Sequence, residues 1–72
     1  MEWVRAGDGE WRLSSPDFEG RAILNQTNEG YIASIKVTEK QFDMELLEDR
    51  DFFETEEEAL QFLKERMERD SY

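Results

Sequence analysis

The chain contains 72 residues, of which 38% are hydrophobic, and its formal net charge is −10 at pH 7. It has no cysteine and no histidine, which excludes disulfides, zinc sites built on thiolate or imidazole, and nucleophilic catalysis by a Ser–His pair. A chain of this length holds one core, so we expect a single domain over residues 1–72. Nine aromatic side chains supply enough apolar area to predict a folded chain rather than a disordered one.

The negative charge is concentrated in the second half of the chain. Residues 1–40 carry seven acids and five bases, a net charge of −2, whereas residues 41–72 carry twelve acids and four bases, a net charge of −8. This excess disfavours direct binding to nucleic acids or anionic membranes, which requires clustered Lys and Arg. It is compatible with a basic protein partner. No apolar run suits a membrane span or a secretory leader, and the absence of cysteine leads us to expect a cytoplasmic protein.

The first nine residues are open to two interpretations. Gly7, Asp8 and Gly9 form a turn signal between an apolar segment around Trp3 and a second one around Trp11. Either the two segments pair as a hairpin, or residues 1–9 form a loose N-terminal arm. We expect the arm, because terminal residues fray unless side chains tie them down. The large apolar ring of Trp3 is the feature that favours the hairpin.

Three strands are predicted in the middle of the chain. Residues 21–26 form one strand, and residues 31–37 and 42–47 alternate apolar and polar side chains with period two. Short polar connections join these strands, which predicts antiparallel neighbours in a meander of three or four strands. Three aliphatic residues are candidates for an apolar patch on the outer face of this sheet: Leu24, Ile32 and Leu47.

An amphipathic helix is predicted over residues 56–69, after a polar break at residues 48–51. Thr55 is the expected N-cap, and Glu58 completes a capping box. The apolar stripe of this helix consists of Ala59, Phe62, Leu63 and Met67. Arg66 lies inside the stripe, where we expect it at the rim with its stem over apolar surface. The alternatives are an ion pair with an acid of the sheet and a contact across a dimer interface. Since the helix stripe and the apolar sheet face must cover each other, the predicted fold class is α+β, with a meander sheet and one C-terminal helix in two layers.

The segment FFETEEEA at residues 52–59 resembles the passage from strand to helix in plant-type AP2 DNA-binding domains and in integrase arm-binding domains. The resemblance extends over residues 52–67 and implies three antiparallel strands before the helix. Those domains bind DNA through Arg and Trp side chains of the sheet, whereas residues 41–72 of this chain have a net charge of −8. No site residue is carried over from the resemblance.

The run from residue 45 to residue 58 contains eight acids and one base. A calcium loop starting at Asp49 would require glycine at its sixth position and an acid at its twelfth. The chain has Glu54 and Leu60 at these positions, so the run does not match a calcium loop. The cap and the helix dipole explain the glutamates of the first helical turn. The acids before the helix are therefore the candidates for partner contact, together with Trp3, because tryptophan is frequent at binding hot spots. The predicted partner-binding residues are Glu45, Glu48, Asp49, Asp51, Glu54 and Trp3.

These observations predict a small, non-catalytic module that binds another protein, with a basic partner or a homodimer as the forms of assembly. No residue pattern indicates an enzyme or a cofactor. One alternative is an acidic nucleic-acid mimic that inhibits a basic nucleic-acid-binding protein, since the run of acids at residues 45–58 could imitate a row of phosphates. The other alternative is a domain that binds divalent cations weakly through the same run.

Overall fold

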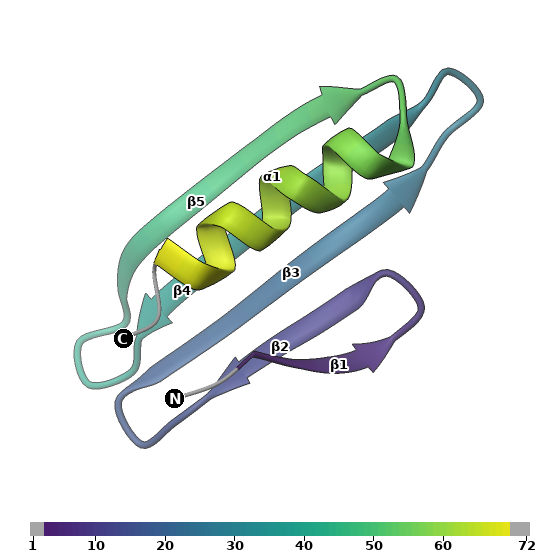
Figure 1. Ribbon diagram of the computed structural model, residues 1–72. Coiled ribbons are helices and arrows are strands. Elements are labelled where there is room, and N and C mark those ends of the chain that lie inside the picture. The colour runs from purple at the N-terminus through teal and green to yellow at the C-terminus, as the bar shows by residue number, and fades with distance from the viewer. Residues whose placement is uncertain (1–2, 70–72) are drawn as a thin grey trace.

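The computed structural model describes residues 3–69 and shows a five-stranded antiparallel sheet followed by one helix (Figure 1). The elements are β1 (Trp3–Gly7), β2 (Glu10–Ser14), β3 (Phe18–Gln26), β4 (Tyr31–Glu39), β5 (Met44–Phe53) and α1 (Glu56–Arg69). Each strand pairs with its neighbour in the chain, so the order in the sheet is β1-β2-β3-β4-β5. The α+β fold with an antiparallel meander is confirmed. The expected count of three or four strands is wrong, because β1 and β2 both join the sheet on the far side of β3.

β1 replaces the loose arm that the sequence suggests for the N-terminal residues, of which residues 1 and 2 lie outside the described part. Trp3 pairs with Leu13 across the β1–β2 hairpin. The indole ring of Trp3 packs over Gly20 of β3, where a Cβ atom would lie only 2.8 Å from the ring. Burial of this ring ties the chain end to the sheet and outweighs the tendency of termini to fray.

β5 runs through the acidic segment that the sequence suggests as a polar break. It pairs with β4 along its whole length of ten residues. The register shifts once, at Leu46, which is the extra residue of a bulge. The four charged residues at 48–51 fit this position because edge strands carry charged side chains on both faces. The expectation of a break at residues 48–51 is therefore wrong.

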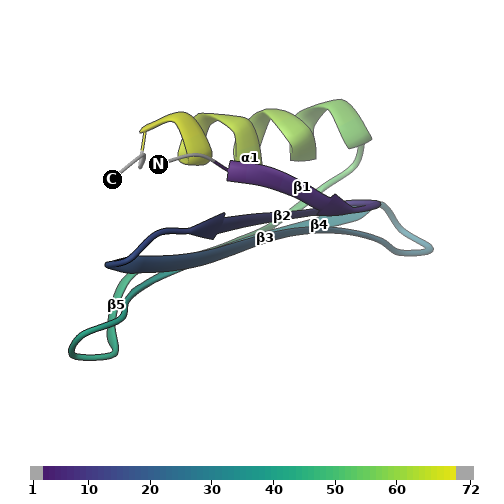
Figure 2. The ribbon, with the colours of Figure 1, turned by 90° about the horizontal axis from the view of Figure 1, so that it is seen from below.

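α1 lies lengthwise over β3, β4 and β5, on one face of the sheet (Figure 2), whereas β1 and β2 lie to one side of it (Figure 1). In the described part of the chain, no second layer covers the opposite face. The buried core between the two layers consists of Ala22, Ala33, Ile35, Ala59, Phe62 and Leu63. Three of these six side chains are alanines, one each from β3, β4 and α1, and their small volume lets the helix approach the sheet closely.

The apolar patch that the sequence suggests on the outer face does not form from its three candidates. Leu24 and Leu47 pack against the core on the helix side, because their cross-strand partners, Ala33 and Val37, are buried there. Ile32 alternates with Ala33 along β4 and lies on the outer face. A shift of one residue in the pairing of a strand moves its side chains to the other face of the sheet. The faces of Leu24 and Leu47 were therefore assigned incorrectly without the strand pairing.

Thr55 begins α1 through a variant of the predicted capping box. Its hydroxyl accepts a hydrogen bond from the Glu58 N–H at 3.3 Å and donates one to the Glu58 carboxylate at 3.0 Å. The carbonyl oxygen of Thr55 accepts a hydrogen bond from the Ala59 N–H at 3.3 Å. Two amides of the first turns therefore have partners within the chain, and no ligand is needed to satisfy them.

Two aspartates of β5 accept hydrogen bonds from backbone amides at the free edge of this strand. The Arg50 N–H donates to the Asp49 carboxylate at 3.0 Å, and the Phe52 N–H donates to the Asp51 carboxylate at 2.8 Å. These two amides are two residues apart, so they point to the same side of the strand, which is the side away from β4. Because these two edge amides already have acceptors, this stretch of β5 is a poorer template for a further strand.

Gly20→Ala should destabilise the protein by about 1–3 kcal/mol, because the added methyl group would lie 2.8 Å from the Trp3 ring and 3.1 Å from the Leu13 side chain. Urea unfolding, followed by tryptophan fluorescence, measures the loss. Gly7→Ala is the matched control, since no atom lies within 4 Å of a Cβ at Gly7. Equal stability of the two variants would show that Trp3 does not rest on Gly20.

Candidate functional site

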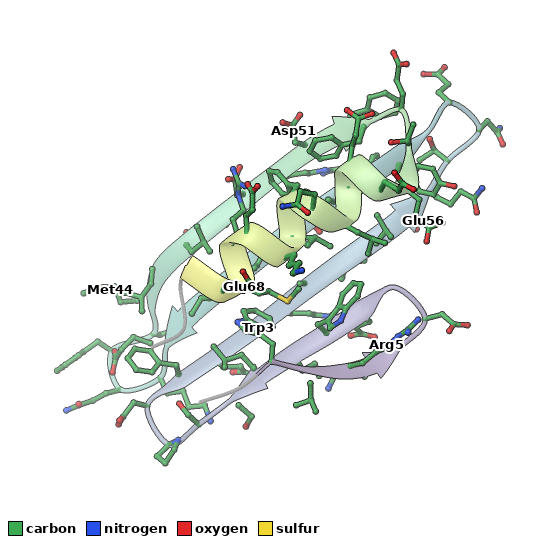
Figure 3. The ribbon with its side chains drawn as sticks, viewed as in Figure 1. Trp3, Arg5, Met44, Asp51, Glu56 and Glu68 are labelled. Atoms are coloured by element: carbon green, nitrogen blue, oxygen red, sulfur yellow. The ribbon has the colours of Figure 1, made fainter. Side chains whose placement is uncertain are left out.

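The predicted partner-binding acids do not form one surface, because β5 alternates its side chains between the two faces of the sheet. Asp49 and Asp51 lie on the helix side, opposite buried residues of β4, whereas Glu45 and Glu48 lie on the outer face. Glu54 is exposed in the link between β5 and α1. The helix side therefore keeps only part of the predicted set, with Asp51 next to the upper end of α1 in Figure 3.

Trp3 lies in β1 and is half-buried against the core on the helix side (Figure 3). Its indole nitrogen is buried and has no hydrogen-bond partner among residues 3–69. A buried donor without a partner costs stability, so packing rather than polar recognition determines where this ring lies. Contact of Trp3 with a partner protein stays a prediction.

A groove of about 520 Å³ opens between α1 and the end of β5. We call it the α1–β5 groove. Its lining consists of Phe53, Glu57, Glu58, Gln61, Phe62, Glu65 and Arg66. The rings of Phe53 and Phe62 form an aromatic pair with centroids 5.1 Å apart and planes tilted by 53°. Three exposed glutamates therefore share the groove with two aromatic rings and one guanidinium group.

Helical spacing brings the polar side chains of the groove together. Glu57, Gln61 and Glu65 follow one another at intervals of four residues, which places them on one side of the helix. The Gln61 side-chain amide donates to the Glu65 carboxylate at 3.0 Å, and the Glu58 carboxylate accepts from the Thr55 hydroxyl. The Glu57 carboxylate has no hydrogen bond or ion pair with other described residues.

Arg66 joins α1 to β5 and contributes the positive charge of the groove. Its Nε atom donates to the Asp49 carboxylate at 2.6 Å, and its Nη1 atom donates to the Phe62 carbonyl oxygen at 3.4 Å. The guanidinium carbon lies 3.7 Å from the centroid of the Phe62 ring, which is a cation–π contact. The ion pair of Arg66 with an acid of the sheet therefore forms, and the same side chain covers the Phe62 ring.

A second depression, of about 300 Å³, lies on the outer face of the sheet. The strand register places Arg12, Arg21 and Lys36 side by side in its lining. Arg12 and Arg21 both donate to the same oxygen of Glu10, at 3.4 and 2.8 Å. The lining also includes two acids, Glu19 and Asp43. Bases and acids are therefore mixed in this depression, with three bases and two acids, whereas acids predominate at the α1–β5 groove.

The chemistry of the α1–β5 groove is that of cation recognition. Carboxylates and aromatic faces both attract cationic side chains, and guanidinium groups in particular. Within residues 3–69, no group of three or more acidic side chains is placed to hold a metal ion, so the divalent-cation alternative gains no support there.

Sequence reasoning missed the groove residues because a cap and a dipole already explained the helix glutamates. The available signal was the repeat of Glu57, Gln61 and Glu65 shortly after Phe53.

Comparison of the chain with protein-family models, with curated proteins and with solved structures finds no match. Within the described residues, no helix is long and apolar enough to cross a membrane. Function is therefore inferred from the geometry and the charge of the α1–β5 groove.

A double-mutant cycle of Asp49→Asn and Arg66→Met should give a coupling energy of about 0.5–1 kcal/mol in urea unfolding. The pair is partly exposed, with 38% of the Asp49 side chain and 22% of the Arg66 side chain accessible, so solvent screens part of its attraction. Glu48→Gln with Arg66→Met is the control cycle, because Glu48 lies on the opposite face of the sheet. A coupling energy no larger than that of the control would show that Arg66 does not anchor α1 to β5.

The Glu10 carboxylate should make the stability of the protein dependent on pH. A hydrogen bond from Arg21 is the main cause that lowers the pKa of Glu10 from its ordinary value of 4.5. A carboxyl group with a lowered pKa in the folded state stabilises the fold above 4.5, and this contribution is lost as the pH falls through the lowered value. The advantage of the wild-type protein over Glu10→Gln in urea midpoint should therefore shrink between neutral pH and a pH well below 4.5.

Glu19→Gln is the control for this measurement, because Glu19 lies on the same face and forms no ion pair among the described residues. If the Glu10→Gln variant and the Glu19→Gln variant changed with pH to the same extent, the pairing of Glu10 with the two arginines would not contribute to stability.

Proposed function

We propose that the protein is a non-catalytic interaction module that binds a basic segment of a partner protein in the α1–β5 groove. The observation that carries this proposal is an aromatic pair, Phe53 and Phe62, beside three glutamates in one open groove. Aromatic surface contributes apolar contact, and carboxylates contribute charge complementarity to a basic partner. Both are features of surfaces that recognise proteins.

The distribution of charge supports a basic partner. Residues 41–72 have a net charge of −8, and they include both elements that border the groove, β5 and α1. On the outer face, Arg12, Arg21 and Lys36 offset the neighbouring acids. Acids outnumber bases in the lining of the groove, and their attraction for a basic segment would accelerate the encounter and be screened by salt.

The nucleic-acid mimic is the less favoured function. A mimic needs a row of carboxylates on one surface, at the spacing of phosphates. β5 instead places Asp49 and Asp51 on one face and Glu45 and Glu48 on the other. The two pairs therefore do not present one continuous row to a partner.

The experiment uses a fluorescent peptide of alternating arginine and serine residues as the probe, with binding measured by fluorescence anisotropy. We expect binding at low ionic strength that weakens as salt is added. The double variant Glu57→Gln/Glu65→Gln should lower the affinity about threefold to tenfold, because each exposed carboxylate contributes up to about 1 kcal/mol to an ion pair.

The matched control is Glu19→Gln/Glu29→Gln, which changes the net charge equally at exposed positions outside the groove. An equal loss of affinity in both double variants would indicate attraction to net charge alone and would contradict a site in the groove. Light scattering on the free protein tests the predicted homodimer separately, by its mass.

A further inference from the structure

We infer that the α1–β5 groove takes an arginine side chain of the partner, with its guanidinium group stacked on the Phe53 ring and paired with Glu57. This inference rests on the proposed function and names the chemistry of the partner. It distinguishes arginine from lysine, which general attraction to an acidic surface does not do.

The chain already holds one guanidinium group, that of Arg66, between an aromatic ring and a carboxylate. Arg66 lies 3.7 Å from the centroid of the Phe62 ring, and its Nε atom donates to Asp49 at 2.6 Å. At this junction of α1 and β5, a ring and a carboxylate, together with the Phe62 carbonyl oxygen, hold an arginine whose side chain is only 22% exposed. The same pair of groups recurs beside it as Phe53 and Glu57, both in the lining of the groove.

The guanidinium group of Arg66 lies over the Phe62 ring, and Phe62 is only 8% exposed, whereas Phe53 is half-buried. Phe53 is therefore the ring of the groove that an incoming side chain can reach. The Glu57 carboxylate is exposed and makes no hydrogen bond or ion pair with the other described residues. It can thus accept both N–H groups of a guanidinium fork without first breaking a contact.

The partner binds through side chains rather than as an added strand. The free edge of β5 borders the groove, and strand addition would need the amides of Arg50 and Phe52. Asp49 and Asp51 already accept hydrogen bonds from these amides, at 3.0 and 2.8 Å. A planar, weakly hydrated guanidinium group both stacks on a ring and forms two parallel hydrogen bonds, whereas an ammonium group does neither equally well.

The test compares three peptides that differ at one residue, which is arginine, lysine or the neutral isostere citrulline, in an otherwise serine-rich sequence with flanking lysines. Binding is followed by NMR, through the ring signals of Phe53 and the affinity derived from them. We expect the arginine peptide to bind about twofold to fivefold more tightly than the lysine peptide, and citrulline to bind most weakly. Ring-current shifts on the arginine side-chain protons should accompany binding.

Phe53→Leu keeps an apolar side chain without the ring, and it should abolish the preference for arginine over lysine. Phe42→Leu is the matched control, because Phe42 is 72% exposed outside the groove. If Phe53→Leu does not fold, Glu57→Gln tests the same site at an exposed position and should reduce the preference. Equal affinity for arginine and lysine in the wild-type protein would overturn the arginine pocket. Salt-dependent binding of both peptides that requires Glu57 and Glu65 would still support the proposed function.

Discussion

The close approach of α1 to the sheet is the contact on which the rest of the structure depends. Ala22, Ala33 and Ala59 are fully buried at this interface, and each lacks the side-chain volume that would separate the two layers. A helix held further away would leave the apolar face of a small meander in water, and a chain of this length has little other core to compensate. The same approach sets Phe62 against Phe53. The fold and the groove therefore arise from one packing arrangement.

The sequence predicts well those elements whose signals are local. α1 follows from Thr55, its cap, and from an apolar stripe at helical spacing, and β4 follows from its alternation. Of the two edge strands, β1 was not predicted and β5 was predicted only over its first residues, because their stability depends on contacts between distant residues. β1 is held by Trp3 over Gly20, and β5 tolerates charge because it pairs on one side only.

The candidate site was predicted only in part, for the same reason. A run of acids in the sequence looks like one surface, but a strand directs consecutive side chains to opposite faces. The groove draws its residues from two elements, and the contact between Asp49 and Arg66 joins residues that are 17 positions apart. Which acids share a surface is thus decided by strand pairing and by the rotation of the helix about its axis, neither of which a short motif encodes.

The order of strands in the sheet has a consequence for how the chain reaches its fold. Every strand pairs with the strand before it, so each pairing closes a short hairpin loop and loses little chain entropy. Low average sequence separation of contacts favours rapid folding. A chain emerging from the ribosome can add its strands one at a time, and only α1 must wait, until β3, β4 and β5 have formed the face that it covers. α1 follows all five strands in the chain, so the element that completes the core is also the last of the described elements to be synthesised.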